Sequence, residues 1–310
     1  MMALRAHRRG GPEQLVVEHA PVPAPAAGEV LVAVHAGAIT FDELTWEETW
    51  TQDGVSRTPV IPSHEVSGVV CEAASEVTDL VPGDEVYGLI RFDRDGAAAD
   101  FVAVPAADLA TKPSTVSHTV AAALPLAGLT ALQALVDHAA VRPGEAVLVH
   151  GGAGGVGALT VQLAVILGAR VTATVRSDAG KLVRGFGAGR VIDVRTEAFD
   201  ESGAIYDVVV DTVGGEVLDR SFGVLRRGGR LITLSAPAPA GRAAEYGVTA
   251  TFFIVTPNRN QLTELAALVD SGRLRVQIAA TFPLDRGREA FESGQRPGRR
   301  AGKTVIVVRD

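Results

Sequence analysis

Cysteine is nearly absent from this chain of 310 residues, in which Cys71 is the only example. A single thiol excludes an intramolecular disulfide, and it excludes zinc and iron–sulfur sites that need several thiolates. This cysteine usage is typical of the reducing cytoplasm, where we expect the protein to be located. No apolar segment follows the charged N-terminus, so the sequence predicts no signal peptide.

Aromatic residues are scarce too, and the chain has no excess of positive charge. Aromatic side chains make up 5% of the chain, which disfavours a stacking surface for single-stranded nucleic acid. The formal net charge is −7, so no overall basic field attracts a phosphate polymer. We therefore expect a small molecule as the partner and no nucleic acid.

Unbroken hydrophobic runs of membrane length are also lacking. Residues 113–136 and 146–169 contain no Asp, Glu, Lys or Arg, and their length alone would nominate both for a membrane. However, Pro125 and Gly128 break the first stretch, and glycines interrupt the second. We expect both to be buried elements of a globular protein, without contact to a membrane.

The spacing of apolar residues differs between the two parts of the chain. Up to about residue 110, short apolar runs are separated by turn signals, and the alternation at residues 30–34 is typical of a half-buried strand. After Pro143, strand-like runs alternate with apolar residues at helical spacing. The sequence thus predicts an α/β protein, with a doubly wound parallel sheet beside a β-rich module.

Glycine is abundant, with 34 residues, and its most informative cluster is Val147-Leu-Val-His-Gly-Gly-Ala-Gly-Gly-Val-Gly157. Gly152, Gly154 and Gly157 form a G-x-G-x-x-G pattern between a predicted strand and a predicted helix. In that context the first glycine permits a tight turn, the second lets backbone approach a pyrophosphate, and the third allows close helix packing. The helix N-terminus adds unpaired N–H groups, so the segment predicts a dinucleotide site.

The end of the next predicted strand indicates which dinucleotide is bound. NAD-binding units usually carry Asp or Glu there, to hold the ribose 2′-hydroxyl. This chain instead has Arg176 and Ser177, followed by Lys181, which suits the 2′-phosphate of NADPH. Asp178 complicates the assignment because it could reach a ribose hydroxyl, and a solvated helix start is the alternative explanation of the cations. We predict NADPH as the cofactor.

Several further motifs occur in a fixed order. They are Pro62-Ser-His-Glu-Val-Ser-Gly68, Val81-Pro-Gly-Asp-Glu-Val-Tyr-Gly88, Ala121-Ala-Ala-Leu-Pro-Leu-Ala-Gly-Leu-Thr-Ala131, Asp211-Thr-Val-Gly-Gly215 and Gly302-Lys303. With the glycine loop, they make the chain resemble the medium-chain dehydrogenase/reductase superfamily, specifically its zinc-free quinone oxidoreductase branch. The resemblance runs nearly from end to end.

The resemblance implies a fold and an assembly. A GroES-like catalytic domain, residues 1–125 and 262–310, would enclose a Rossmann NADPH-binding domain, residues 126–261. The nicotinamide would lie in the cleft between the domains. A homodimer would form through the edge strand near residues 251–255.

The resemblance also implies residues that contact the cofactor. Thr130 would bond its ribose or amide, unless it is a helix N-cap. Residues of the last Rossmann strand would place backbone groups beside the carboxamide. The complete predicted set is Thr130, Gly152, Ala153, Gly154, Gly155, Val156, Gly157, Arg176, Ser177, Lys181, Val213, Phe253, Ile254, Val255 and Lys303.

Zinc-dependent relatives combine a Gly-His-Glu motif with two cysteine ligands. Here His64 and Glu65 match that motif, with Ser63 in place of the glycine. Thr40 and Leu126 occupy the positions of the cysteines. One nitrogen ligand and one carboxylate do not make a closed zinc site, so we predict no metal. His64 would pack or hydrogen-bond near the cleft.

The acceptor pocket is expected around residues 37–50, where Thr40 stands at a position commonly held by Asn in relatives. The segment holds both tryptophans of the chain, Trp46 and Trp50, which are four residues apart and could share a helix face. Either they form a flat apolar wall for a planar acceptor, or they pack the helix onto its domain. We predict Thr40, Trp46 and Trp50 in the pocket and expect Glu43 to be an exposed loop carboxylate.

The resemblance implies hydride transfer from NADPH to a quinone or an α,β-unsaturated carbonyl, without zinc. The proton donor is open, with Tyr87 and His64 as candidates and water as the alternative; Tyr87 either packs or faces the cleft. A zinc-free alcohol or ketone reductase, or a tailoring reductase of secondary metabolism, is the second enzyme hypothesis. A crystallin-like protein that binds NADPH without turnover is the non-enzymatic one.

Overall fold

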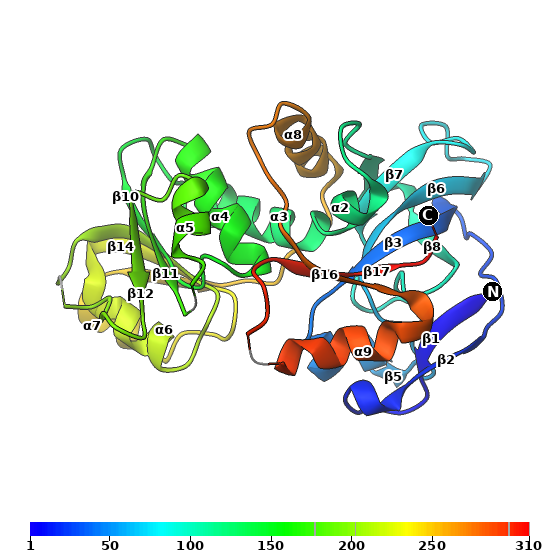
Figure 1. Ribbon diagram of the computed structural model, residues 1–310, viewed down its shortest axis with the longest axis horizontal. Coiled ribbons are helices and arrows are strands. Elements are labelled where there is room, and N and C mark those ends of the chain that lie inside the picture. The colour runs from blue at the N-terminus through cyan, green and yellow to red at the C-terminus, as the bar shows by residue number, and fades with distance from the viewer. Residues whose placement is uncertain (177, 202, 297, 310) are drawn as a thin grey trace. The chain divides into compact units, whose positions relative to one another are not determined.

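The computed structural model describes residues 1–176, 178–201, 203–296 and 298–309. The chain forms two compact units (Figure 1). Unit 1 comprises Met1–Leu129 and Thr256–Asp310, and unit 2 comprises Thr130–Val255. Unit 1 is therefore assembled from both ends of the chain, and the middle of the chain forms unit 2.

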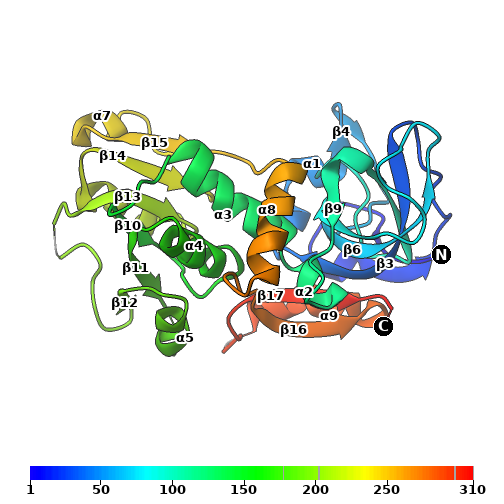
Figure 2. The same cartoon turned by 90° about the horizontal axis from the view of Figure 1, so that it is seen from above.

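Unit 2 is built on a six-stranded parallel sheet (Figure 2). Its strands are β10 (Ala146–Val149), β11 (Arg170–Val175), β12 (Arg190–Asp193), β13 (Tyr206–Asp211), β14 (Leu225–Thr233) and β15 (Thr249–Phe252). Their spatial order is β12-β11-β10-β13-β14-β15, so the winding reverses between β10 and β13. The predicted doubly wound parallel sheet is confirmed.

The helices of unit 2 follow the strands in turn. α4 (Gly155–Ile166) and α5 (Gly180–Gly185) come after β10 and β11, whereas α6 (Glu216–Ser221) and α7 (Arg242–Tyr246) come after β13 and β14. The π-helical segment η4 (Gln133–His138) and the 3₁₀ turn η5 (Phe222–Val224) complete the unit. Because parallel crossovers are right-handed, the reversal of the strand order places the two pairs of helices on opposite faces of the sheet.

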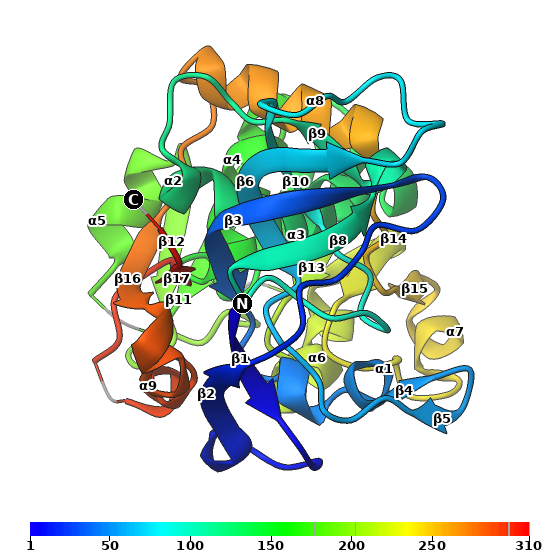
Figure 3. The same ribbon diagram turned by 90° about the vertical axis from the view of Figure 1, so that its right-hand side faces the viewer.

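Unit 1 contains a seven-stranded sheet (Figure 3). Its path is β16-β17-β3-β6-β7-β9, and β8 pairs with β3. The bounds are β3 (Glu29–Ile39), β6 (Glu65–Ala73), β7 (Glu85–Leu89), β8 (Phe101–Pro105), β9 (Leu109–Thr111), β16 (Ile278–Pro283) and β17 (Lys303–Val307). Two antiparallel pairs stand beside it: β1 (Met2–Ala6) with β2 (Leu15–His19), and β4 (Thr51–Gln52) with β5 (Val55–Ser56).

β3 organises unit 1, since it pairs with β6, β8 and β17. The prediction that residues 30–34 form a half-buried strand was wrong, because all five of them are buried. The reason lies on the second face, where Ala36 and Ala38 pack against Ala122 and Ala123. These small side chains let a helix cover a face that alternation alone had assigned to solvent.

The helices of unit 1 are mostly short. They are α1 (Glu47–Trp50), α2 (His118–Ala122), α3 (Pro125–Leu132), α8 (Arg259–Asp270) and α9 (Gly287–Glu292), with the turns η1 (Pro12–Gln14), η2 (Glu43–Thr45), η3 (Ala106–Asp108), η6 (Leu284–Arg286) and η7 (Ser293–Gln295). α3 ends in unit 2. α8 begins after Asn258, whose Oδ1 accepts a hydrogen bond from the Gln261 amide at 3.1 Å, as expected of an N-cap.

The two uncharged stretches fold as predicted into buried elements. The first contributes α2 and α3, and the second contributes β10 and α4. Proline and glycine limit the length of these helices, and α4 has only 12 residues. Over the described ranges, the structure contains no helix that combines the length and the apolar character needed to cross a bilayer.

Candidate cofactor and active site

The glycine loop joins the end of β10 to the start of α4. The left-handed residue is Gly151, with φ of +71°, so the tight turn belongs to it and not to Gly152 as predicted. Gly152 instead packs beside Ala173 of β11, where an added Cβ would come within 2.8 Å of the alanine Cβ. A Cβ on Gly157 would overlap the Gly151 carbonyl oxygen. The first turn of α4 therefore touches the loop backbone directly, which requires glycine at both positions.

The N-terminus of α4 is uncapped. Its N-cap residue, Gly154, has no side chain to accept a hydrogen bond, and no acidic residue lies in the first turn. The amides of Gly155 and Val156 thus open the helix with the positive end of its dipole. Thr174 anchors the loop to β11, since its hydroxyl accepts from the Gly151 amide at 3.2 Å and its carbonyl from the Gly152 amide at 2.9 Å. This geometry fits the pyrophosphate of a dinucleotide.

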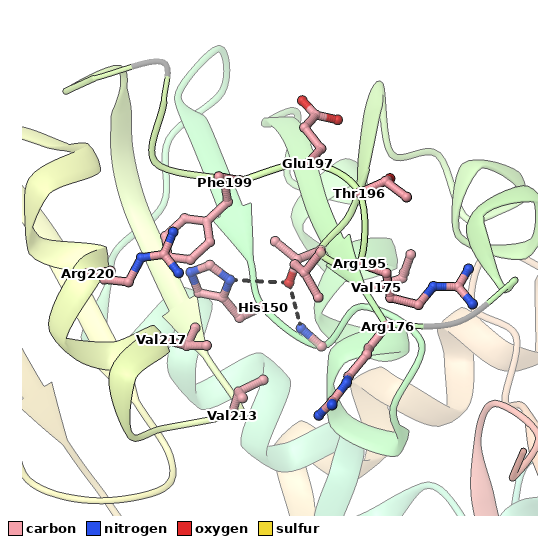
Figure 4. Close-up of a pocket in the computed structure, with 14 residues that line it drawn as sticks. His150, Val175, Arg176, Arg195, Thr196, Glu197, Phe199, Val213, Val217 and Arg220 are labelled. Carbon is pink, nitrogen blue, oxygen red and sulfur yellow. Dashed lines mark hydrogen bonds between the residues drawn. The ribbon is translucent and has the colours of Figure 1, made fainter. Parts of the chain in front are cut away.

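A pocket of about 640 Å³ opens beside the loop (Figure 4). It is lined by His150, Gly151, residues 174–176, residues 194–199, Val213, Val217 and Arg220. His150 forms its buried base, with Nδ1 at 3.2 Å from the Thr174 hydroxyl and Nε2 at 3.0 Å from the Ser221 hydroxyl. Burial lowers the pKa of His150 to about 3, so this imidazole is neutral at physiological pH.

Three arginines line the pocket. Arg220 lies beside the Phe199 ring, at 4.9 Å from its centroid, and pairs with Asp200 at 2.8 Å (Figure 4). Arg195 pairs with Asp193 at 2.6 Å and with Asp178 at 2.8 Å. Arg195 and Arg220 were not predicted. The position of Arg195 just after a predicted strand could have identified it as a pocket residue, because ligands bind at the carboxyl ends of parallel strands.

The predicted cations have different surroundings. Arg176 lines the pocket and is exposed, and its guanidinium has no ion pair within the described ranges. Lys181 is an exposed residue of α5 that does not line the pocket. Asp178, the carboxylate that complicated the NADPH assignment, pairs with Arg195. Ser177 lies outside the described residues.

The other predicted cofactor residues of unit 2 are spread over three elements. Val213 follows β13, lines the pocket and is 53% exposed. Phe253 packs against His138 at 4.2 Å between ring centroids, Ile254 is exposed and Val255 is buried. Thr130 is buried inside α3, which begins at Pro125, so its alternative assignment as an N-cap was wrong.

In unit 1, Lys303 is held inside a buried polar cluster. Its ammonium forms an ion pair with Glu65 and donates to the Thr40 hydroxyl at 3.3 Å. Glu65 also accepts from the Leu126 amide at 2.9 Å. Burial raises the pKa of the Glu65 carboxyl, and the Lys303 ammonium opposes that shift. Two predicted site residues, Thr40 and Lys303, are thus brought together.

The two tryptophans do not share a helix face. α1 starts after Trp46, so only Trp50 belongs to the helix. Trp50 is 3% exposed and its Nε1 donates to the Leu44 carbonyl at 2.9 Å, which makes it a packing residue and corrects its prediction as part of the pocket. Trp46 is half-buried against Phe92, with 4.9 Å between ring centroids. The helix is too short to align residues four apart.

Glu43 is buried, contrary to the prediction of an exposed loop carboxylate. Its side chain is 1% exposed, with Oε2 at 2.9 Å from Nδ1 of His64. Oε1 accepts from the Ser63 amide at 3.1 Å. Two polar partners offset the loss of water around this carboxylate. The surrounding sequence contains no apolar residue spacing that would have indicated burial.

Tyr87 does not face a cleft. It is fully buried in β7, and its hydroxyl donates to the Leu262 carbonyl of α8. Burial raises the pKa of this phenol far above its ordinary value. Tyr87 is therefore a packing residue, and the structure corrects its candidacy as proton donor.

Comparison with known proteins agrees with this architecture. Residues 26–114 match the alcohol dehydrogenase GroES-like domain, and residues 186–306 match the zinc-binding dehydrogenase family. The chain is 33% identical over 309 residues to the chloroplastic NADPH-dependent alkenal/one oxidoreductase of Arabidopsis thaliana, covering 96% of this chain and 77% of that protein. The chain belongs to the medium-chain dehydrogenase/reductase family.

Solved structures place the chain among the quinone oxidoreductase-like members of this family. The quinone oxidoreductase from Coxiella burnetii superposes with a TM-score of 0.91 at 30% identity, covering 100% of this chain and 99% of that chain. The CurK enoyl reductase superposes with a TM-score of 0.87 at 26% identity, covering 99% and 98%. The resemblance to the quinone oxidoreductase-like members inferred from the motifs is confirmed, and the chain is an NAD(P)H oxidoreductase of this family.

Some members of this family carry zinc, but the donor set of this chain does not fit it. Over the ranges that the structure describes, no three His, Cys, Asp or Glu side chains are grouped so as to hold a metal ion. Thr40 and Leu126 stand at the cysteine positions, and the Lys303 ammonium beside Thr40 would repel a divalent cation.

We expect Gly157→Ala to weaken dinucleotide binding by at least about tenfold, because the added Cβ forces the loop away from the N-terminus of α4. Fluorescence titration with NADPH measures the dissociation constant. Gly185→Ala is the matched control, since a Cβ there meets nothing within 4 Å. Equal affinities of the two variants would contradict the role of this contact.

We expect Tyr87→Phe to lower the free energy of unfolding by about 1 kcal/mol, the value of one buried hydrogen bond. Turnover should stay unchanged, because the phenol only packs. Denaturant unfolding and steady-state kinetics measure the two quantities. A variant of normal stability that has lost turnover would restore Tyr87 as a proton donor.

Proposed function

We propose that this protein is an NADPH-dependent reductase of quinones or α,β-unsaturated carbonyls that works without zinc. The observation that carries the proposal is the arginine-lined pocket beside the uncapped α4 helix. Relatives support the acceptor class, since their names describe an alkenal/one oxidoreductase and a quinone oxidoreductase. The arginine pocket supports the cofactor.

The preference for NADPH rests on charge at the end of β11. No carboxylate stands at the strand end, where an NAD-binding unit would hold the ribose diol. Arg176 offers a guanidinium without an ion pair in the described part of the chain, and Arg195, although paired with two aspartates, adds a second guanidinium to the pocket. The Asp178 carboxylate pairs with Arg195, which reduces its repulsion of a 2′-phosphate.

In this proposal, unit 1 contributes the groups that bind the acceptor. When bound, NADPH supplies the hydride. The Lys303 ammonium can only donate, so the Thr40 hydroxyl must accept from it and keeps its own proton to donate. That proton is suited to a hydrogen bond with the acceptor carbonyl, which it polarises. Trp46 remains our candidate for an apolar wall beside a planar acceptor.

A cytoplasmic homodimer completes the proposal. β15 lies at the edge of the sheet of unit 2, and among the described residues no strand pairs with its outer side. Phe252 and Ile254, in and just after that strand, are exposed hydrophobic residues. An exposed edge strand with apolar side chains is suited to pairing with a second copy.

Arg176→Ala should raise the KM for NADPH by about 10- to 100-fold, the cost of one charge-assisted hydrogen bond, and leave the KM for NADH unchanged. Initial rates with both cofactors measure this. Arg184→Ala on α5 removes an equally exposed guanidinium outside the pocket and should change neither KM. An NADH preference in the parent chain, or one retained in Arg176→Ala, would sink the assignment.

The purified protein should oxidise NADPH with quinones or enones and leave simple ketones and alcohols unchanged. Absorbance at the reduced-nicotinamide band, followed over a panel of these acceptors, measures the rates. Turnover of ketones alone would favour the alcohol or ketone reductase instead. Binding of NADPH with no acceptor reduced would show a binding protein without turnover.

A further inference from the structure

One buried nitrogen in unit 1 lacks a partner. His64 is 1% exposed, and its Nδ1 lies 2.9 Å from Oε2 of Glu43. Its Nε2 is also buried but has no hydrogen-bond partner within the described residues. A buried polar atom without a partner costs free energy, so its presence calls for a ligand or a chemical role.

The Glu43 carboxylate beside this imidazole is firmly held. The turn η2 that carries it is fixed by two side chains of α1: the Thr49 hydroxyl donates to the Glu43 carbonyl at 2.6 Å, and Trp50 Nε1 donates to the Leu44 carbonyl. Its Oε1 accepts from the Ser63 amide. The carboxylate is therefore positioned before any ligand arrives.

Ser63 aims that amide at Glu43 by adopting an unusual backbone conformation. Its φ is +76°, the left-handed region that favours glycine. The Ser63 hydroxyl donates to the Ala38 carbonyl at 3.0 Å and locks the residue there. Strained backbone of this kind gathers at functional sites, where the surrounding structure maintains it.

These contacts determine which nitrogen can react. The Glu43 carboxylate accepts hydrogen bonds, so Nδ1 of His64 carries a proton and Nε2 is the site that gains or loses one. The neighbouring carboxylate, Glu65, pairs with Lys303 and leaves Glu43 as the partner of this ring.

The imidazole also belongs to an aromatic cluster that includes Trp46, the candidate wall of the acceptor pocket. Its ring stands edge-on to Phe92, with 5.4 Å between centroids, and Phe92 stands edge-on to Trp46. Such apolar neighbours lower the polarity around the ring. They strengthen any hydrogen bond that Nε2 makes to a bound molecule.

We propose that His64 is the catalytic proton donor of the reductase and that Glu43 is the residue that positions it. The inference rests on the proposed function. When hydride adds to the β-carbon of an enone, the C=C π pair moves to form an enolate. The Nε2–H bond of the imidazolium then breaks, and its proton bonds to the enolate. Neutral His64 regains a proton from water, so one hydride and one proton are consumed per acceptor.

The test compares His64→Gln with His118→Gln. His118 is the matched control, because it too lies in unit 1 and pairs with a carboxylate, that of Glu85 at 3.1 Å, although its other ring nitrogen contacts the Ser67 hydroxyl at 2.8 Å. His64→Gln should lower kcat by about 100-fold with the NADPH dissociation constant unchanged. It should also enlarge the solvent deuterium isotope effect on kcat. His118→Gln should leave both unchanged.

Two further variants separate a chemical role from a structural one. Glu43→Gln keeps a hydrogen-bond acceptor for Nδ1 and removes the charge, so kcat should fall by about tenfold without a change in melting temperature. Added imidazole should restore turnover to His64→Ala, which a packing defect would not allow. If the parent enzyme is active, a normal kcat of His64→Gln, or a His64→Ala variant that imidazole does not rescue, would overturn the proposed roles of His64 and Glu43. A parent chain that reduces no acceptor would instead overturn the proposed function, and these roles with it.

Discussion

The contact between the loop after β10 and the first turn of α4 is the constraint on which the nucleotide unit depends. The Gly151 carbonyl oxygen occupies the place of a Gly157 side chain, and Gly151 itself needs a left-handed backbone. With glycine at both positions, α4 starts without a capping side chain and keeps its amides free for an anion. The pocket follows from this contact, because it opens at the strand ends beside the loop.

The buried polar residues of unit 1 are organised differently: two adjacent residues, His64 and Glu65, each have a separate partner. Glu65 is the first residue of β6 and His64 directly precedes it, and successive residues of an extended chain point in opposite directions. His64 contacts Glu43 of the turn η2, whereas Glu65 contacts Lys303 of β17. Each buried carboxylate therefore has its own polar partner, which is how two carboxylates are tolerated in one interior. The same alternation separates a candidate proton donor from the cluster that carries Thr40.

Much of the fold could be predicted from local pattern. The strands of the parallel sheet, the glycine loop and α8 are encoded by contiguous apolar runs and by glycine at fixed spacing. The site was less predictable. Arg195 reaches the pocket only because β12 lies beside β11, and Asp178 pairs with it across that gap. Tyr87 and Trp50 were sound candidates as residue types, yet their polar atoms bond to backbone carbonyls inside unit 1.

The sequence by itself determined the winding of the sheet, the family and the loop that suits a dinucleotide, because each of these is written in short contiguous segments. Only the tertiary structure decided which polar residues are buried and with whom they pair. Glu43 and His64 are separated by 21 positions, and Lys303 lies 263 positions beyond Thr40. Burial and pairing of charges depend on contacts between distant segments, and no local pattern carries that information.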